Sequence, residues 1–156
     1  MTTERAAGIV MCYMGDGKPK YLVLHTALGY WGLVRGHIEK GEQEQQAALR
    51  ELCEETRLSH VFLLHGFCAS TKYYFTRNKE TIFKEVTYFL GESPTKEVVL
   101  SEEHIGYRWL NFDMALKALT FPNDKDILTK ADHWMKTKRP TSGGSFSGHG
   151  LVGNET

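Results

Sequence analysis

GHIEKGEQEQQAALRELCEETRL, residues 36–58, gathers three glutamates near its end: Glu51, Glu54 and Glu55. Residues Gln43–Thr56 have the apolar spacing of a helix, and at about 100° per residue the three carboxylates fall on one face. Like charges one turn apart destabilise a helix, and acidic residues near its C-terminus oppose the helix dipole. A solvated surface is the ordinary fate of such a cluster, but a bound cation would offset the repulsion.

The chemistry of this acidic face favours a hard divalent cation, Mg²⁺ or Mn²⁺, because both prefer oxygen ligands. Leu49, Leu52 and Cys53 lie on the opposite face and are expected to contact the core. Ala47 and Ala48 flank the carboxylates, where small side chains leave room for a ligand. The stretch therefore predicts an amphipathic helix that binds a metal on one face.

Strands and further helices are expected on both sides of this helix. Alternating or continuous apolar residues predict strands over Ala6–Met14, Lys20–Thr26, Val61–Ala69, Lys72–Thr76, Ile82–Gly91 and residues 107–112. Residues 77–80, RNKE, read as a turn. Asn111 and Asn123 are expected to cap two later helices. Strands interleaved with helices predict a layered α/β domain with a mixed sheet.

Length and charge restrict the classes of protein. The chain has 156 residues, enough for one domain, with 19 basic and 19 acidic side chains. This balance argues against strong nucleic-acid or membrane-surface binding, and no apolar run approaches the roughly 18 residues of a membrane span. We expect the domain to cover residues 1–138 and the Gly- and Ser-rich residues 139–156 to form a disordered tail.

The number and spacing of the cysteines indicate the redox state of the compartment in which the protein acts. Cys12, Cys53 and Cys68 are odd in number and lack a C-x-x-C spacing. A disulfide framework or a zinc site would need a different pattern. We therefore expect a reducing compartment, the cytoplasm.

The spacing around the acidic cluster resembles the Nudix box, Gly-x5-Glu-x7-Arg-Glu-U-x-Glu-Glu-x-Gly-U, where U is a bulky aliphatic residue. Gly36, Glu42 and the run Arg50-Glu51-Leu52-x-Glu54-Glu55-x-x-Leu58 match it. Arg57 stands where the box has Gly. That position is expected to end the helix in a left-handed conformation, so Arg57 should carry about 1 kcal/mol of strain.

This resemblance implies an α/β/α sandwich with a mixed sheet, and a metal-dependent hydrolase of pyrophosphate bonds in nucleoside diphosphates linked to another group. It implies that Mg²⁺ or Mn²⁺ is held by Glu51, Glu54 and Glu55, near the backbone of Gly36. Glu42 and Arg50 are implied to form a structural pair that braces the loop against the helix.

Outside the box, several stretches resemble asymmetrical diadenosine tetraphosphate hydrolases. These stretches are Trp31-x-x-Val34-Arg35-Gly36-His37, Tyr74-x-x-Arg77-Asn78-Lys79, Lys84-x-Val86-x-Tyr88-Phe89-Leu90 and Leu100-Ser101-Glu102-Glu103-His104 with Tyr107-Arg108-Trp109-Leu110. Val34 replaces a family Pro, and Arg35 replaces a Lys thought to meet phosphate. Because a guanidinium can also bind phosphate, through two N–H groups, function can survive the replacement of Lys by Arg35.

The resemblance assigns roles by position. The implied substrate-binding residues are Trp31, Arg35, His37, Tyr74, Lys84, Tyr88 and Tyr107. Glu103 is implied to be a metal ligand or the general base, alongside the three catalytic glutamates of the helix. Core positions stay equally open for Trp31 and Tyr88, His37 is expected to orient its loop, and His104 to cap or orient Glu103.

Three functions follow as hypotheses. The leading one is hydrolysis of diadenosine tetraphosphate to ATP and AMP, with a small-molecule nucleotide as the partner. The second is a Nudix hydrolase of another substrate, either the 5′ triphosphate end of RNA, which the balanced charge disfavours, or a nucleoside diphosphate derivative. The third is a catalytically silent Nudix module that only binds a ligand, which the intact glutamates disfavour.

Overall fold

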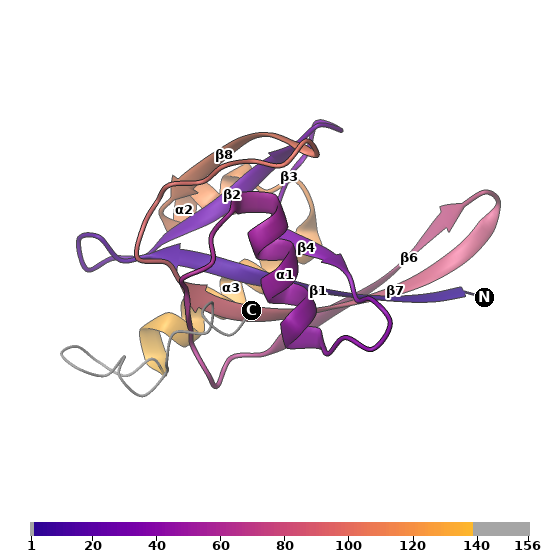
Figure 1. Ribbon diagram of the computed structural model, residues 1–156, viewed down its shortest axis with the longest axis horizontal. Coiled ribbons are helices and arrows are strands. Elements are labelled where there is room, and N and C mark those ends of the chain that lie inside the picture. The colour runs from indigo at the N-terminus through magenta and orange to yellow at the C-terminus, as the bar shows by residue number, and fades with distance from the viewer. Residues whose placement is uncertain (1, 139–156) are drawn as a thin grey trace.

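Helices lie on both faces of a mixed eight-stranded sheet in the computed structural model, which describes residues 2–138 (Figure 1). The strands are β1 (Thr2–Tyr13), β2 (Lys20–Thr26), β3 (Trp31–Gly32), β4 (Val34–His37), β5 (Phe62–Leu63), β6 (Ala69–Arg77), β7 (Glu80–Glu92) and β8 (His104–Leu110). The helices are α1 (Glu44–Thr56), α2 (Phe112–Ala118) and α3 (Pro122–Thr137). The predicted tail, residues 139–156, lies outside the described residues.

Divergence of β1 and β2 creates the opening in which the functional residues lie. These two strands pair only where Cys12 and Tyr13 meet Tyr21 and Lys20. Beyond that point β3 pairs with β2 and β4 pairs with β1. On its other side, β1 runs parallel to β7, whereas the other strand pairs are antiparallel. Residues 31–37 therefore wedge the two strands apart.

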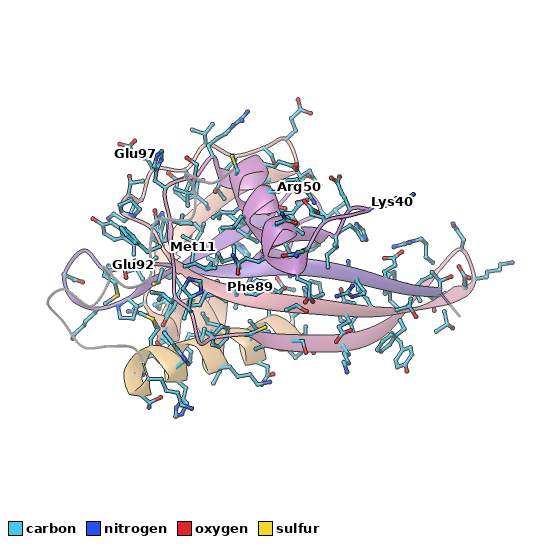
Figure 2. All side chains as sticks on the ribbon, turned by 60° about the horizontal axis from the view of Figure 1, so that its bottom comes forward. Met11, Lys40, Arg50, Phe89, Glu92 and Glu97 are labelled. Carbon is cyan, nitrogen blue, oxygen red and sulfur yellow. The ribbon has the colours of Figure 1, made fainter. Side chains whose placement is uncertain are left out.

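Strand β1 supplies both halves of the core, because alternate side chains point to opposite faces. Ala7, Ile9 and Met11 pack in the cluster under α1, which also contains Leu49 and Leu52 of that helix. Ala6, Val10 and Cys12 pack in the cluster under α3, together with Ile127, Leu128, Ala131, Trp134 and Met135. Figure 2 shows α1 on one side of the sheet and α3 on the other. The predicted α/β/α sandwich is confirmed.

Several predicted boundaries are wrong. β1 begins at Thr2 rather than Ala6, and the last strand ends at Leu110, because Phe112 already belongs to α2. The strand expected over Val61–Ala69 is interrupted: β5 ends at Leu63, and Gly66 turns the chain with φ 105° against the ring of Trp134. The last helix begins at Pro122 and has Phe121, not Asn123, as its N-cap. Proline is favoured in the first turn because its φ is already helical and its missing N–H is not needed there.

Helix α1 follows its prediction in extent but not in every contact. It runs from Glu44 to Thr56, one residue shorter than predicted, because Gln43 is its N-cap. Ala47 and Ala48 are fully buried against the sheet, so they do not leave room for a ligand beside the carboxylates. Cys53 is only half-buried. The helix therefore packs against the sheet through Ala47 and Ala48, and these small side chains bring its backbone close to β1 and β4.

The β6–β7 hairpin extends beyond the helices, beside the N-terminal end of β1 (Figure 1). Its predicted turn is confirmed: Asn78 and Lys79 join the strands with φ of 51° and 66°, the left-handed pair that suits a two-residue hairpin. Asn111 caps α2 as expected, its side chain accepting the amide of Met114 at 2.9 Å. No helix among residues 2–138 has both the length and the apolar content to cross a bilayer.

Arg57 ends α1 in the left-handed conformation, with φ 64°, and its amide donates to the carbonyl of Cys53 at 2.9 Å. Arg57→Gly should relieve about 1 kcal/mol of strain, partly offset by the greater entropy of the unfolded chain. We expect a modest rise in the melting temperature and unchanged kcat, measured by thermal unfolding and steady-state kinetics. Lys79→Gly, at a similar φ far from α1, is the matched control. A clear loss of kcat/KM would show that the Arg57 side chain acts in the site.

Candidate active site

Arg50 ties α1 to the loop that precedes it. Its guanidinium is bidentate on Glu42, with Nε to Oε2 at 2.7 Å and Nη2 to Oε1 at 3.1 Å. Nη2 also donates to the carbonyl of His37 at 2.9 Å. The structure thus brings the predicted pair into contact, and a planar fork fixes the helix relative to the end of β4.

The three helix carboxylates lie in different surroundings. Glu54 is exposed and accepts Arg50 Nη1 at 3.0 Å, on the outer side of the helix. Glu51 is half-buried and lies against Gly36, where a Cβ atom would overlap its carboxylate. Glu55 is 5% exposed. Glu51 and Glu55 therefore lie at the opening between the strands, while Glu54 faces solvent. Arg50 Nη1 contacts both Glu54 and Glu51, the latter at 3.1 Å.

A cleft of about 600 Å³ opens in front of Glu51 and Glu55. The predicted residues that line it are Arg35, Gly36, His37, Arg50, Glu51, Glu55, Lys84 and Glu103. Glu103 comes from the loop before β8, whose carbonyl at that residue accepts the amide of Ala27 at 2.9 Å. Residues from β4, α1, β7 and this loop are thus gathered around one space.

Other predicted substrate residues lie elsewhere. Tyr74 is 63% exposed on the hairpin and packs on Phe83, and Tyr107 is exposed on β8. Trp31 stacks on His25 with ring centroids 4.4 Å apart. Tyr88 is fully buried, and its hydroxyl accepts Arg35 Nη1 at 3.1 Å.

A second cavity of about 370 Å³ adjoins the cleft, and Arg35 lines both. Its aromatic lining includes Tyr30, Tyr73, Phe121 and the predicted substrate residue Tyr88, and the rings of Tyr30 and Phe121 meet edge-on with centroids 5.0 Å apart. Asp124 at the start of α3 also lines it. Alternation along β6 turns Tyr73 inward and Tyr74 outward. We call this space the aromatic pocket.

Electrostatics divide the cleft into two parts. Burial, and then the charges of Glu51 and Glu103, raise the pKa of Glu55, and burial also raises the pKa of Glu51. In the basic part of the cleft, which contains Arg35 and Lys84, burial and the nearby charge of Arg35 lower the pKa of Lys84. Two carboxylates that resist ionisation mark a place for a cation, and two adjacent cations mark a place for an anion.

A family model described as the NUDIX domain matches residues 2–131. The chain belongs to the Nudix family. Relatives include the asymmetrical bis(5′-nucleosyl)-tetraphosphatase of Caenorhabditis elegans, 32% identical over 130 residues that cover 81% of this chain and 92% of that protein. The enzyme of the same name from Rattus norvegicus is 31% identical over 122 residues, covering 74% and 80%.

The fold comparison agrees. The crystal structure of a C. elegans Ap4A hydrolase binary complex aligns with a TM-score of 0.75 at 25% identity, covering 85% of this chain and 98% of that chain. The predicted family is therefore confirmed, and this protein is a Nudix hydrolase.

Nudix hydrolases generally require a divalent metal, so the donor set must be compared with such an ion. Within residues 2–138, no three acidic, histidine or cysteine side chains already converge closely enough to form a complete cage. Mg²⁺ ordinarily binds through one or two carboxylates and completes its shell with water and substrate phosphates. Glu51 and Glu55 both line the cleft, and of the two only Glu51 is paired with Arg50, at 3.1 Å, so these two carboxylates fit this mode. Glu54, held by Arg50, stays a predicted ligand.

His104 also lines the cleft, next to a carboxylate that the sequence did not predict as its neighbour. Its side chain is 8% exposed, and Nε2 lies 3.9 Å from Glu55 Oε1. Its Nδ1 lies 3.3 Å from Ser101 Oγ. We expected it to orient Glu103, its neighbour in the chain, but it packs against Glu55. Burial lowers the pKa of His104, although the charge of Glu103 opposes this shift.

Proposed function

We propose that this Nudix hydrolase cleaves dinucleoside tetraphosphates asymmetrically and releases ATP and AMP from diadenosine tetraphosphate, with Mg²⁺ or Mn²⁺ as the cofactor. One observation carries the proposal: a cleft with an acidic and a basic part is joined at Arg35 to an aromatic pocket. A nucleoside polyphosphate has the matching order of groups, a stackable base at the end of a chain of anions. The names of the C. elegans and rat relatives support this substrate class.

The chain's own residues divide the work as follows. Glu51 and Glu55 hold the cation, which when bound neutralises phosphate charge and activates water. Arg35 and Lys84 bind phosphate oxygens, because Arg50, which also lines the cleft, is already paired with Glu42, Glu51 and Glu54. Glu103, exposed at the cleft edge, accepts the proton of the attacking water. His37, bonded to Glu4 at 3.2 Å, orients the end of β4.

The aromatic pocket receives a base. Tyr30, Tyr73 and Phe121 present ring faces and edges to it, and stacking of a base on such rings contributes about 1–3 kcal/mol. We assign base contact to these residues rather than to Tyr74 and Tyr107, which lie outside both cavities. Cytoplasmic action fits the described residues, which contain no disulfide.

Purified protein with Mg²⁺ should convert diadenosine tetraphosphate to ATP and AMP in equal amounts, resolved by ion-exchange chromatography, and a chelator should abolish turnover. Diadenosine pentaphosphate, a sugar nucleotide and triphosphorylated RNA form the comparison panel. Two molecules of ADP as the main product would contradict asymmetrical cleavage. Faster turnover of another panel member would identify a different Nudix substrate, and no turnover at all would favour a binding module.

A further inference from the structure

Asp124 holds the guanidinium of Arg35 from the side away from the cleft. Arg35 Nη1 donates to Asp124 Oδ1 at 3.0 Å and to the Tyr88 hydroxyl at 3.1 Å. The Arg35 side chain is 19% exposed and that of Asp124 is 5% exposed. Among residues 2–138, no acceptor pairs with Arg35 Nε or Nη2, and neither atom is sealed from solvent. One nitrogen is therefore anchored in the protein, and the other two stay open toward the cavities.

This anchoring is costly for the fold. Asp124 Oδ2 is buried, and the described part of the chain offers it no hydrogen-bond partner. Burial raises the pKa of Asp124 even though the charge of Arg35 and hydrogen bonds with Arg35 and Tyr88 oppose the shift. A buried ion pair with an unsatisfied oxygen contributes little to stability, because desolvation offsets the attraction. Orientation of Arg35 explains the pair better than stability does.

The chemistry of arginine suits this arrangement. A guanidinium is a rigid planar fork with five N–H donors, so one edge can be anchored while another binds an anion. A lysine ammonium, a single point charge on a flexible chain, cannot be oriented in this way. Arg35 lines both the cleft and the aromatic pocket. The orientation of its plane therefore decides where an anion lies relative to the pocket.

We propose that Asp124 is a positioning residue that fixes the Arg35 guanidinium so that Nε and Nη2 face the substrate's phosphates where the cleft meets the aromatic pocket. The phosphate ligand rests on the proposed function; the pairing of Asp124 with Arg35 does not. Asp124 acts only through Arg35. Its loss should weaken substrate binding and leave the chemical step almost unchanged.

A double-mutant cycle tests this coupling. Asp124→Asn, Asp124→Ser and Arg35→Lys are made singly, and each Asp124 change is combined with Arg35→Lys. With diadenosine tetraphosphate and Mg²⁺, each Asp124 variant should raise KM about tenfold, or about 1.4 kcal/mol, with kcat within about twofold. In the Arg35→Lys background the same change should alter KM by less than about twofold, because the group that it positions is absent. The two Asp124 variants keep the cycle usable if one fails to fold.

Asp132→Asn is the matched control. Asp132 is also a buried carboxylate on α3, at 3% exposed, but it binds the Tyr21 hydroxyl at 2.7 Å and Lys136 Nζ at 2.8 Å, and it lines neither cavity. This variant should lower the melting temperature without changing KM. An equal rise of KM in Asp132→Asn would attribute the Asp124 effect to general loosening of α3 and overturn the proposal.

A second readout separates this inference from the choice of nucleotide. Titration calorimetry gives the Kd of inorganic tripolyphosphate with Mg²⁺ for the same variants. If wild-type protein does not cleave diadenosine tetraphosphate but the tripolyphosphate cycle shows the coupling, positioning by Asp124 stands and the substrate is another polyphosphate. Unchanged Kd and KM in the Asp124 variants, or equal losses with Arg and with Lys at position 35, would refute it.

Discussion

Glu55→Gln should lower kcat by about two to three orders of magnitude, the usual effect of removing one charge-stabilising group from an active site. Glu55 is the most buried of the helix carboxylates and faces the cleft beside Glu51. Glutamine keeps the shape of the side chain but lacks the negative charge that a divalent cation needs. Steady-state kinetics at saturating Mg²⁺ measures the loss. Turnover within about threefold of wild type would show that Glu55 does not hold the cation.

The same variant should be more stable than wild type when metal is absent. Burial, with the charges of Glu51 and Glu103, raises the folded-state pKa of Glu55 above the unfolded value of 4.5. Its contribution to stability is therefore complete below pH 4.5 and is lost as pH rises toward the folded pKa. Glu55→Gln avoids that loss. Its advantage in melting temperature with a chelator should grow from about pH 4.5 toward the folded-state pKa of about 9.

Glu54→Gln is the control for this stability effect. Glu54 is exposed and paired with Arg50 at 3.0 Å, so its removal should give a small, pH-independent decrease in melting temperature. If Glu54→Gln and Glu55→Gln shift the melting temperature in parallel at every pH, the burial argument for Glu55 is wrong.

Gly36→Ala should reduce kcat/KM by about 100-fold. A Cβ atom at Gly36 would overlap the Glu51 carboxylate, and β4 cannot retreat because Gly36 pairs with Ala7 in the sheet. Glu51 must therefore leave its position, and misplacement by about 1 Å can cost that factor. Gly106→Ala is the control, since its Cβ would meet His25 only at an ordinary 3.5 Å. Wild-type kinetics for Gly36→Ala would exclude the proposed packing.

Local patterns predicted the fold well where the apolar residues followed the spacing of a single helix or strand. The helix over 44–56 and the turn at Asn78 and Lys79 depend on residues close together in the chain, so they could be predicted. The apolar run at residues 61–69 could not. Its hydrophobicity suits a strand, but the turn at Gly66 against Trp134 depends on α3, which lies far along the chain.

The site residues likewise fall into those that local sequence patterns predicted and those that they did not. Gly36, Glu51 and Lys84 were indicated by short motifs and meet in one cleft. Tyr73 was missed in favour of Tyr74 because a shift of one residue reverses the face of a strand. Asp124 was missed because its partner, Arg35, lies 89 positions away. No local pattern reports a pair that only the folded chain brings together.

The parallel pairing of β1 with β7 has a consequence for synthesis. β1 leaves the ribosome well before β7, yet Thr2 pairs with Ile82 and Cys12 with Glu92. Until β7 emerges, the apolar first strand lacks its longest neighbour, and such exposed strands are prone to aggregate. Closing so long a loop also makes folding slow. A nascent chain that stops short of residue 92 should therefore depend on chaperones, and no shorter N-terminal fragment should assemble the cleft.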